Sequence, residues 1–437
     1  MIAPTPGDRI ELTIDDLSYL GDGVGHLDRS FAVFIKGALP GERVVAVVEE
    51  RRRRYARGGL VEVLEPSAHR VSAPCPYFPA CGGCQWQGLA YDQQLIWKTE
   101  LIRRQLQHVG HLVDPPVQPM IGTANPWHYR NQARFSVDPT GHLAFTRAHS
   151  RNLLPIDLCL IMQQPIVELM PRLQQVLPGA HQIVVRYGAR TGQLVIAPEL
   201  PIPSSELPSG QPFYEEVLLG RTYRVSAPSF FQVNTRIDDR PLPSQIRQPW
   251  VRQLAGVPVG ESALLPTDEP VVALSQTDLL ALIVLDRLNL TGHEVIVDAY
   301  GGVGTFALLI AQRAKLVFGI EEAHSAVLDA EHNAQGVDNV RFLVGRTEEL
   351  LATIEPKPDA VVVDPSRVGC APEVMQALIT NHPETIVYVS CDPATLARDL
   401  EQLRAGGYRL EDVQPIDMFP QTHHIEAVCL LKAAEAV

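Results

Sequence analysis

The sequence contains no long apolar segment. No uninterrupted apolar run approaches the roughly 20 residues that a membrane-spanning helix requires. The first residues, M-I-A-P-T-P-G-D-R, also lack a basic region followed by an apolar core, so we expect no signal peptide. We therefore predict a cytoplasmic protein without a membrane partner, in a compartment where disulfides are rare.

The sequence also lacks an excess of positive charge. Its net charge of −13 argues, taken alone, against nucleic-acid binding, but such binding depends on local patches. The densest patch is R-R-R-R-Y-A-R at 51–57, which fits either a solvated hairpin turn or a nucleic-acid contact. With 437 residues and 46% hydrophobic residues, the chain has enough material for the cores of two to four domains.

Cysteine is scarce, and its distribution is uneven. Three of the seven cysteines, Cys75, Cys81 and Cys84, lie within ten residues in C-P-Y-F-P-A-C-G-G-C. Cys159 is the only other cysteine outside the C-terminal half and can supply a fourth ligand. Four cysteines fit tetrahedral zinc or a [4Fe–4S] cluster. Zinc sites commonly contain a second C-x2-C or an H-x3-H pair, and the sequence has neither, which favours the iron–sulfur cluster. We expect the cluster to act as a clamp on the fold.

The N-terminal residues 1–66 alternate as a small β unit. Short strands are predicted at 8–14, 32–35, 43–49 and 59–64, separated by Gly-rich turns and the arginine run. This spacing indicates a compact β-barrel. The patterns G-D-G-V-G and F-I-K-G-A-L-P-G-E-R-V resemble a TRAM domain, an OB-like RNA-binding barrel, and this resemblance favours RNA contact by the arginine run.

Residues 67–225 are predicted to form an α+β central domain. An amphipathic helix is predicted at 91–110, ending at Gly110 and packing on the C-terminal domain. Several arginines lie beside aromatic residues in the following strands, a mixture typical of single-stranded RNA contacts. The predicted strands are 128–137, 142–147, 182–188 and 193–198, and the basic and aromatic residues are Arg130, Arg134, Arg147, Arg151, Tyr129 and Phe135.

Residues 226–437 alternate between strands and helices, which predicts a doubly wound parallel sheet. A proline-rich stretch at 238–270 is interpreted as a surface insertion, and a helix is predicted at 274–288. The predicted strands are 294–300, 316–321, 360–365, 386–391 and 427–432.

The first strand-to-helix turn of this region carries Gly301, Gly302 and Gly304 in V-D-A-Y-G-G-V-G-T-F. Glycines there let a ligand approach the backbone. Glu321 ends the next strand, at the position that accepts ribose hydroxyls. With D-P-S-R at 364–367, this set looks like a class I S-adenosylmethionine-dependent methyltransferase. NAD is the competing cofactor, although Ala307 replaces the third glycine of its fingerprint.

Cys391 lies at the carboxyl end of a predicted strand, in I-V-Y-V-S-C-D-P. Pro393 stops the strand, and open α/β sheets place ligands at this end. A strand-end cysteine can be a buried small hydrophobe, as we expect of Cys370 and Cys429. Cys391 is instead predicted to be a nucleophile because of the motif that continues after it.

Several motifs occur together in one order: C-x5-C-G-G-C…C, S-F-F-Q-V-N, D-x-Y-G-G-x-G-x-F, D-P-x-R, S-C-D-P-x-T-L-A-R-D and H-x-I-E. The chain thus resembles the RNA (uracil-5-)-methyltransferase family, specifically its iron–sulfur, TRAM-bearing members that act on 23S ribosomal RNA. The resemblance implies a class I Rossmann-like domain behind an OB-like barrel and an α+β domain, and we expect a monomer. It implies a [4Fe–4S] cluster on Cys75, Cys81, Cys84 and Cys159, and S-adenosylmethionine contacts from Gln232, Tyr300, Thr305, Glu321 and Asp364.

The resemblance further implies that Cys391 is the nucleophile and that Glu426, in T-H-H-I-E, is the base. A thiolate adding to uracil C6 makes C5 nucleophilic toward the sulfonium methyl, and a base then removes the C5 proton. Asp364 can orient the uracil edge or the cofactor, and Arg367 can bind phosphate. The neighbouring His423 and His424 can also suggest a metal. A base in structured RNA must flip out to reach such a pocket.

Two other functions fit the sequence. One is the same reaction on the T-loop uridine of transfer RNA, and the other is a catalytically silent iron–sulfur RNA-binding protein. The chain departs from the family pattern at Gly301, where cysteine is usual, at Thr305, where asparagine is common, and at Arg346. Ser366 replaces a second proline, and the 238–270 stretch is atypical. These departures concern the cofactor and RNA grooves and remove no catalytic group.

Overall fold

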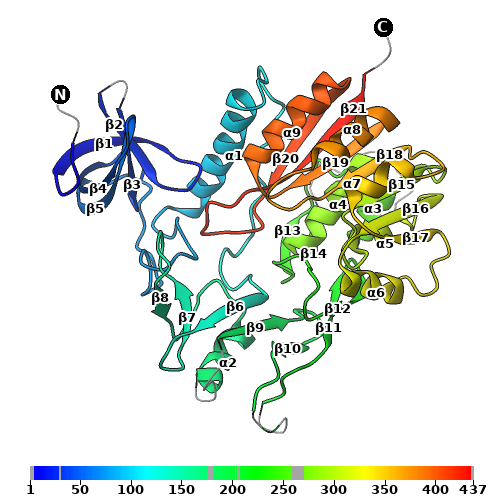
Figure 1. The fold of residues 1–437 in the computed structure, drawn as a ribbon, viewed down its shortest axis with the longest axis horizontal. Helices are drawn as coiled ribbons and strands as arrows, with labels where there is room; N and C mark the ends of the chain where they lie inside the picture. Colours follow the sequence, from blue (N-terminus) through cyan, green and yellow to red (C-terminus); the bar gives the residue numbers. More distant parts are fainter. Residues whose placement is uncertain are drawn as a thin grey trace.

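The computed structural model describes residues 4–28, 31–174, 181–201, 203, 207–257 and 270–434. A small barrel lies at one end of the molecule and a large sheet with its helices at the other, as Figure 1 shows. A long helix lies between them, and a smaller sheet lies below it. Within the described ranges, no helix is both long enough and apolar enough to cross a membrane.

The N-terminal strands close into a barrel in the order β1-β2-β3-β5-β4, which confirms the predicted fold. The sequence patterns did not predict β2, which begins inside the Gly-rich stretch 21–25. A Cβ on Gly25 would lie 2.4 Å from the Thr13 carbonyl oxygen, so this glycine permits close approach of two strands. The strands are β1 Arg9–Leu17, β2 Gly23–Asp28, β3 Phe31–Lys36, β4 Arg43–Arg51 and β5 Tyr55–Glu65.

The arginine run lies at the β4–β5 hairpin. Arg51 ends β4 and Tyr55 begins β5, so only Arg52, Arg53 and Arg54 form the turn. These three side chains are exposed, whereas the guanidinium group of Arg57 lies about 6 Å from the ring of Tyr55. The predicted hairpin turn is therefore present, and it presents its charge to solvent.

The central region combines a five-stranded sheet, ordered β10-β9-β6-β7-β8, with one helix. Phe135, Ile166 and Ile183 lie in its hydrophobic core, with the helix α2 packed on the sheet. The predicted strands correspond to β6, β7, β9 and β10, whereas β8, β11, β12 and α2 were not predicted. The elements are α1 Tyr91–His108, β6 Gln132–Val137, β7 Leu143–Thr146, β8 Leu153–Pro155, α2 Gln164–Gln174, β9 Gln182–Tyr187, β10 Leu194–Ala197, β11 Phe213–Leu218 and β12 Arg221–Ser226.

Seven strands form the large sheet in the order β17-β16-β15-β18-β19-β21-β20. The first five are parallel, whereas β21 is antiparallel to β19 and β20 is antiparallel to β21. The predicted alternation of strands and helices is confirmed. The prediction of a wholly parallel sheet was wrong, because β20 connects to β21 without a crossover helix and the two strands are antiparallel. The strands are β15 Val295–Ala299, β16 Leu316–Glu321, β17 Val340–Val344, β18 Ala360–Val363, β19 Thr385–Ser390, β20 Tyr408–Ile416 and β21 Glu426–Ala433.

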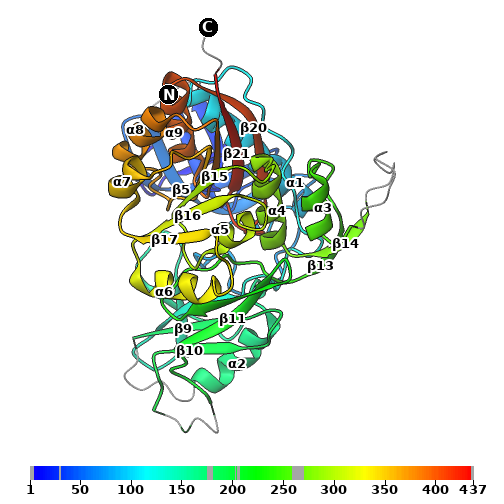
Figure 2. The ribbon, with the colours of Figure 1, turned by 90° about the vertical axis from the view of Figure 1, so that its right-hand side faces the viewer.

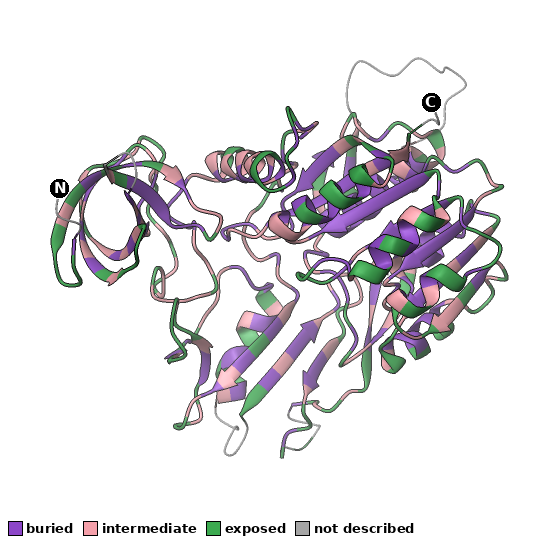
Figure 3. Ribbon diagram, turned by 45° about the horizontal axis from the view of Figure 1, so that its top comes forward, coloured by how far each residue is buried: buried purple, intermediate pink, exposed green. Residues whose placement is uncertain are grey.

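Helices cover both faces of this sheet. Val387 and Val389 of β19 pack toward one face, and Ile386 and Tyr388 pack toward the other. Figure 3 shows the resulting buried strands beneath helices whose outer surfaces are exposed. The helices are α4 Gln276–Leu288, α5 Thr305–Ile310, α6 His324–Asn333, α7 Thr347–Leu350, the 3₁₀ turn η1 Leu351–Thr353, α8 Pro372–Asn381 and α9 Pro393–Ala405.

The stretch 238–270 is partly described. Its ends contain β13 Asp238–Pro241 and α3 Pro249–Leu254, and β13 pairs with β14 Val271–Leu274. Figure 2 shows this hairpin projecting beside α3 and α4. Leu242, Ile246 and Val251 are fully buried against α4, so the described part contributes to the core. Residues 258–269 lie outside the described residues.

The barrel and α1 pack against one face of the large sheet and the helices that cover it. Leu17 and Leu39 of the barrel share a hydrophobic cluster with Trp86, Tyr388 and Ile425. Leu101, Ile102 and Leu106 of α1 are buried in the same cluster, with α1 beside α9 in Figure 1. The N-terminal unit is therefore held against the layer that carries Cys391.

Candidate functional site

The carboxyl edge of the parallel strands brings together the predicted site residues. Glu321 ends β16, Tyr300 follows β15, Asp364 follows β18 and Cys391 follows β19. The chain leaves β15 toward β16 on one side and later returns to β18 on the other. This reversal of strand order creates the crevice in which open α/β sheets bind ligands.

Cys391 and Glu426 face each other across an antiparallel pair. Ser390 of β19 pairs with Ala427 of β21, so the next position in register places Cys391 opposite Glu426. Residues in direct opposition have Cα atoms about 4.5–5.5 Å apart. Glu426 is buried and Cys391 is half-buried. The thiol and the carboxyl are therefore close enough to act on one small ring.

Gln232 joins this edge from the segment between β12 and β13. Its side-chain amide donates to an Asp364 carboxylate oxygen at 3.4 Å. Ser229, three residues earlier, donates from its hydroxyl to Asp329 of α6 at 2.8 Å. Asn234 donates to the Met418 carbonyl on the other side. The S-F-F-Q-V-N motif is thus anchored at both ends, which fixes Gln232 beside Asp364.

The glycine turn after β15 has the backbone geometry expected of a ligand cradle. Tyr300 has φ of +124°, a conformation rare for a residue with a side chain and frequent at ligand-binding sites. The Gly302 amide donates to Glu321 Oε2 at 3.0 Å, which fixes the glycine turn against a predicted cofactor residue. A Cβ at Gly301 would approach nothing closer than 3.6 Å, so the usual cysteine would fit there. Thr305 begins α5 beside this turn.

Buried carboxyl groups dominate the electrostatics of the site. Burial raises the pKa of Asp298 to about 7 and, with the nearby Asp298, that of Asp364 to about 7. Burial and Asp364 also raise the pKa of Glu426 well above its usual value, with Arg367 acting in the opposite direction. Asp298 accepts from the Ala307 amide through one oxygen, and its other oxygen is buried without a partner. The sequence patterns did not indicate Asp298.

The surroundings of the Cys391 thiol favour its protonated form. Burial, together with the neighbouring Glu426 and Asp364, raises its pKa to about 12, while Arg367 acts in the opposite direction. The residues after it are ordered by Asp392, whose Oδ1 accepts from the amides of Ala394 and Thr395 and caps α9. Cys391 is thus held between a buried strand and a capped helix.

The histidine pair beside Glu426 connects this site to the central region. The rings of His423 and His424 lie 4.4 Å apart, and an Arg367 nitrogen lies 3.4 Å from His424 Nε2. Burial lowers the pKa of His423 to about 4, so its imidazole is neutral near pH 7. Nowhere in the part of the chain that the structure describes are three His, Cys, Asp or Glu side chains arranged to hold a metal ion.

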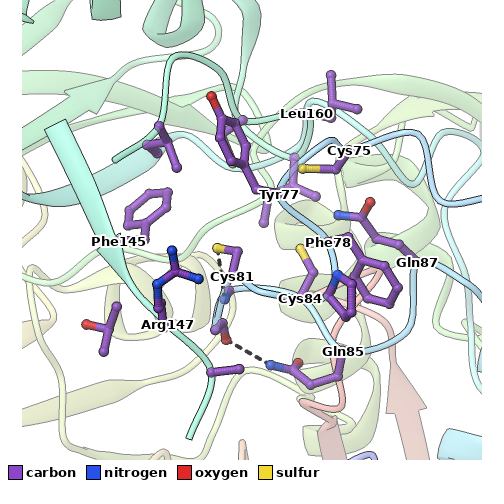
Figure 4. A pocket seen from close by; sticks show the side chains of 18 of the residues that line it. Cys75, Tyr77, Phe78, Cys81, Cys84, Gln85, Gln87, Phe145, Arg147 and Leu160 are labelled. Carbon is purple, nitrogen blue, oxygen red and sulfur yellow. Dashed lines mark hydrogen bonds between the residues drawn. The ribbon is translucent and has the colours of Figure 1, made fainter. Parts of the chain in front are cut away.

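The four predicted cluster cysteines line one cavity of about 540 Å³. Figure 4 shows Cys75, Cys81 and Cys84 along this cavity, with Arg147 beside Cys81. The Gly83 amide donates to Cys81 Sγ at 3.4 Å, as expected of a tight turn between ligands. Cationic side chains surround the thiols, and His423 also reaches this cavity. The lining includes Cys159, Lys36, Arg130 and Arg134.

Comparison with known proteins identifies the family. The tRNA (uracil-5-)-methyltransferase family model matches residues 283–434, and the TRAM domain model matches residues 4–61. An uncharacterized RNA methyltransferase of Halalkalibacterium halodurans is 35% identical, with 97% of each chain covered. One of Gloeobacter violaceus is 34% identical, with 98% of this chain and 97% of that one covered. The chain belongs to the RNA (uracil-5-)-methyltransferase family.

A solved structure supports the fold of this RNA methyltransferase. The tRNA (uracil-54, C5)-methyltransferase of Pyrococcus abyssi, solved with S-adenosyl-L-homocysteine, superposes with a TM-score of 0.68. The match covers 97% of this chain and 100% of the other, and the two sequences are 22% identical. The comparison therefore shows similarity of fold alone. The predicted family and the predicted TRAM barrel are both confirmed, and RNA is the class of substrate. The individual roles of the site residues stay predictions.

Proposed function

We propose that this methyltransferase methylates C5 of a specific uridine in 23S ribosomal RNA, with Cys391 as nucleophile and Glu426 as base. The observation that carries the proposal is the register of β19 and β21, whose last pair is Ser390 with Ala427, so that Cys391 and Glu426 follow directly at the sheet edge. C5 methylation requires a nucleophile at C6 and a base at C5, which are adjacent atoms of one ring. Two side chains on neighbouring strands can reach adjacent atoms together.

The residues act in a fixed order. The Cys391 thiolate forms a bond to uracil C6, and the electron pair of the C5–C6 double bond moves toward the C4 carbonyl, giving an enolate with negative charge on O4 and a nucleophilic C5. C5 then takes the methyl group, and Glu426 as carboxylate removes the C5 proton. The electron pair of that C–H bond restores the C5–C6 double bond and expels the Cys391 thiolate. Asp364, neutral or singly charged near pH 7, can hold the uracil edge.

S-adenosylmethionine would supply the methyl group as a sulfonium. Gln232, Tyr300, Thr305, Glu321 and Asp364 are the residues that we propose to hold it. The Glu321 carboxylate, fixed by the Gly302 amide, is suited to accept ribose hydroxyls. Gly302 is half-buried with a positive φ, and no atom lies within 4 Å of the place that a Cβ would occupy, so the backbone there is open to a ligand.

We propose that the cysteine cavity holds a [4Fe–4S] cluster and not zinc, because the sequence lacks the second C-x2-C or H-x3-H pair that is common in zinc sites. Among the described residues these cysteines do not form a group that could hold a metal ion as they stand, so the proposal rests on their spacing in the sequence and on the cavity that they share. Four thiols around one cavity suit a larger group, and Lys36, Arg130, Arg134 and Arg147 would offset its negative charge. We propose Cys75, Cys81, Cys84 and Cys159 as its ligands, and its role as a clamp between the segment 75–84 and the central sheet.

Replacing one proposed cluster ligand is expected to remove the iron. Anaerobically purified protein should be brown with about four iron atoms per chain, whereas Cys84→Ala should lose most of the iron and the colour. Iron analysis and the absorption spectrum measure both. Cys429→Ala is the matched control, because Cys429 is buried within β21, between β19 and β20, and its loss should leave the iron intact. Stoichiometric zinc without iron would contradict the cluster.

Transfer RNA is a second candidate substrate. The solved structure with the same fold is that of a tRNA (uracil-54, C5)-methyltransferase, and the matching family model carries a tRNA description. The cysteine motif favours ribosomal RNA. The test uses methyl-labelled S-adenosylmethionine with unmodified transcripts of 23S ribosomal RNA and of transfer RNA, followed by mapping of the label. We expect one uridine of the 23S transcript to be labelled at C5, whereas label in transfer RNA alone would contradict the ribosomal assignment.

The addition step is expected to accelerate with pH. Thiolate addition at C6 allows hydrogen at C5 to exchange with water, so release of tritium from 5-³H-uridine RNA reports on Cys391 without methyl transfer. Since Cys391 must lose its proton and its pKa is raised to about 12, the rate should rise from about pH 6 to about pH 9. A Cys391→Ala sample corrects for background. A rate that is flat across this range would mean that the thiolate already predominates.

A further inference from the structure

A loop of the barrel reaches the residue that follows Cys391. The Tyr19 hydroxyl, in the loop between β1 and β2, donates to Asp392 Oδ2 at 2.6 Å. The Tyr19 ring also meets His423 edge to face, with ring centroids 6.2 Å apart. Tyr19 lies in the matched TRAM segment, 373 residues before its hydrogen-bond partner. The proposed RNA-binding barrel is therefore in direct contact with the catalytic edge.

Asp392 divides its two carboxylate oxygens between two parts of the molecule. Oδ1 accepts from the amides of Ala394 and Thr395 and caps α9. Oδ2 accepts from Tyr19 of the barrel. The side chain that immediately follows Cys391 is thus fixed from both sides, and a change on the barrel side is transmitted to the turn that carries the thiol.

The barrel loop itself is firmly seated. The Trp86 indole nitrogen donates to the Gly21 carbonyl at 3.1 Å, and a Cβ at Gly21 would lie 2.8 Å from the same nitrogen. Arg104 of α1 holds Asp16 at the end of β1 through both carboxylate oxygens. Leu17 is buried in the cluster that contains Tyr388. The loop therefore presents Tyr19 from a rigid base.

We propose that Tyr19 is a positioning residue for Cys391, acting through Asp392, so that the seated barrel completes the catalytic turn. This inference rests on the proposed function, because it needs Cys391 as the nucleophile. It gives the TRAM barrel a part in the chemistry besides holding RNA. The hydroxyl group of Tyr19 is the part that acts on Asp392, since the Tyr19→Phe variant would keep the contacts of the ring.

The charges around Cys391 determine the expected pH effect. Glu426, Asp364 and Asp392 raise the pKa of Cys391, and Arg367 lowers it. Tyr19 stays neutral because burial and Asp392 raise its own pKa far above its usual value. Its hydroxyl partly offsets the charge of Asp392, so removing that donor exposes Cys391 to more negative potential. The pKa of Cys391 then rises further, and the thiolate fraction at a given pH falls.

The test compares Tyr19→Phe with Tyr408→Phe in the full-length protein. Tyr408 donates to the Leu378 and Pro383 carbonyl oxygens at the opposite end of the sheet, so its variant loses comparable hydrogen bonds far from Cys391. At saturating RNA, Tyr19→Phe should slow 5-³H release at pH 7 about tenfold, with its pH profile displaced upward and its RNA affinity unchanged. Tyr408→Phe should lower the melting temperature and leave the saturated rate and pH profile unaltered.

A double-mutant cycle with Asp392→Asn tests the route of the effect. Asparagine keeps an oxygen that can cap α9, but removes the charge that Tyr19 offsets. Tyr19→Phe should therefore cost much less in the Asp392→Asn background than in the wild type. Equal costs in both backgrounds would overturn action through Asp392.

The outcomes separate this inference from the proposed function. A wild-type rate and pH profile in Tyr19→Phe, or a loss confined to RNA affinity, would overturn the inference alone. Absence of 5-³H release by the wild-type enzyme on its mapped RNA would overturn the proposed function and the inference together. Melting curves for every variant identify losses that come from unfolding.

Discussion

Cys391→Ala is expected to reduce methyl transfer by at least about 10⁴-fold, while S-adenosylmethionine and RNA still bind. The loss follows from the order of bond formation, because without a bond to C6 the C5 carbon is too weak a nucleophile. The alanine variant also removes little volume from a half-buried position, so the fold should persist. Single-turnover transfer of labelled methyl groups to the mapped RNA measures the effect.

Two matched variants control this result. Cys429→Ala removes a fully buried thiol inside β21 and should keep most of the activity, because Cys429 lies three residues along the strand from the end that carries Glu426. Cys391→Ser keeps the shape and a weaker nucleophile and should be nearly as inactive as the alanine variant. Activity of Cys391→Ala within about tenfold of the wild type would rule out covalent catalysis by this residue.

Glu426→Gln is expected to separate methyl transfer from product release. The glutamine can still occupy the buried site opposite Cys391, but it cannot take the C5 proton. Turnover should fall by about 10²- to 10⁴-fold. RNA should meanwhile accumulate in a methylated adduct with the protein, because β-elimination of the thiolate requires loss of that proton.

Denaturing gel electrophoresis with labelled RNA detects this adduct. About one methyl group per protein chain should be incorporated quickly and then remain bound. The double variant Cys391→Ala with Glu426→Gln should give no adduct, which shows that the trapped species depends on the thiol. Fast release of methylated RNA from Glu426→Gln would mean that another group removes the C5 proton, and Asp364 would be the next candidate.

Much of the site could be predicted because each residue belongs to a local motif. Strand-end positions and glycine turns are local features, so Glu321, Asp364 and Cys391 were predicted at one sheet edge, where the structure places them. The link from Gln232 to Asp364 and the packing of α1 depend on the tertiary fold. The family resemblance supplied the role of Gln232, which its short motif alone does not define.

Other features depend on tertiary pairing and could not be read from local patterns. The antiparallel return of β21 places Glu426 opposite Cys391, whereas a parallel strand would have put it at the other end of the sheet. Residues 21–25 were expected to form a turn, but Gly25 allows close approach to the Thr13 carbonyl and belongs to β2. The contact between Tyr19 and Asp392 joins positions 373 residues apart, and neither residue stands out in its own segment.

The most direct test of the central claim is to identify the residue that bonds to the substrate. RNA containing 5-fluorouridine at the mapped position blocks proton removal at C5, so the adduct formed with S-adenosylmethionine cannot resolve. Protease digestion and mass spectrometry of this adduct locate the attachment. We predict one modified peptide, with the methylated fluorouridine attached to Cys391 through C6. Attachment at Cys370 or another residue, or methylated RNA released without any adduct, would contradict the claim.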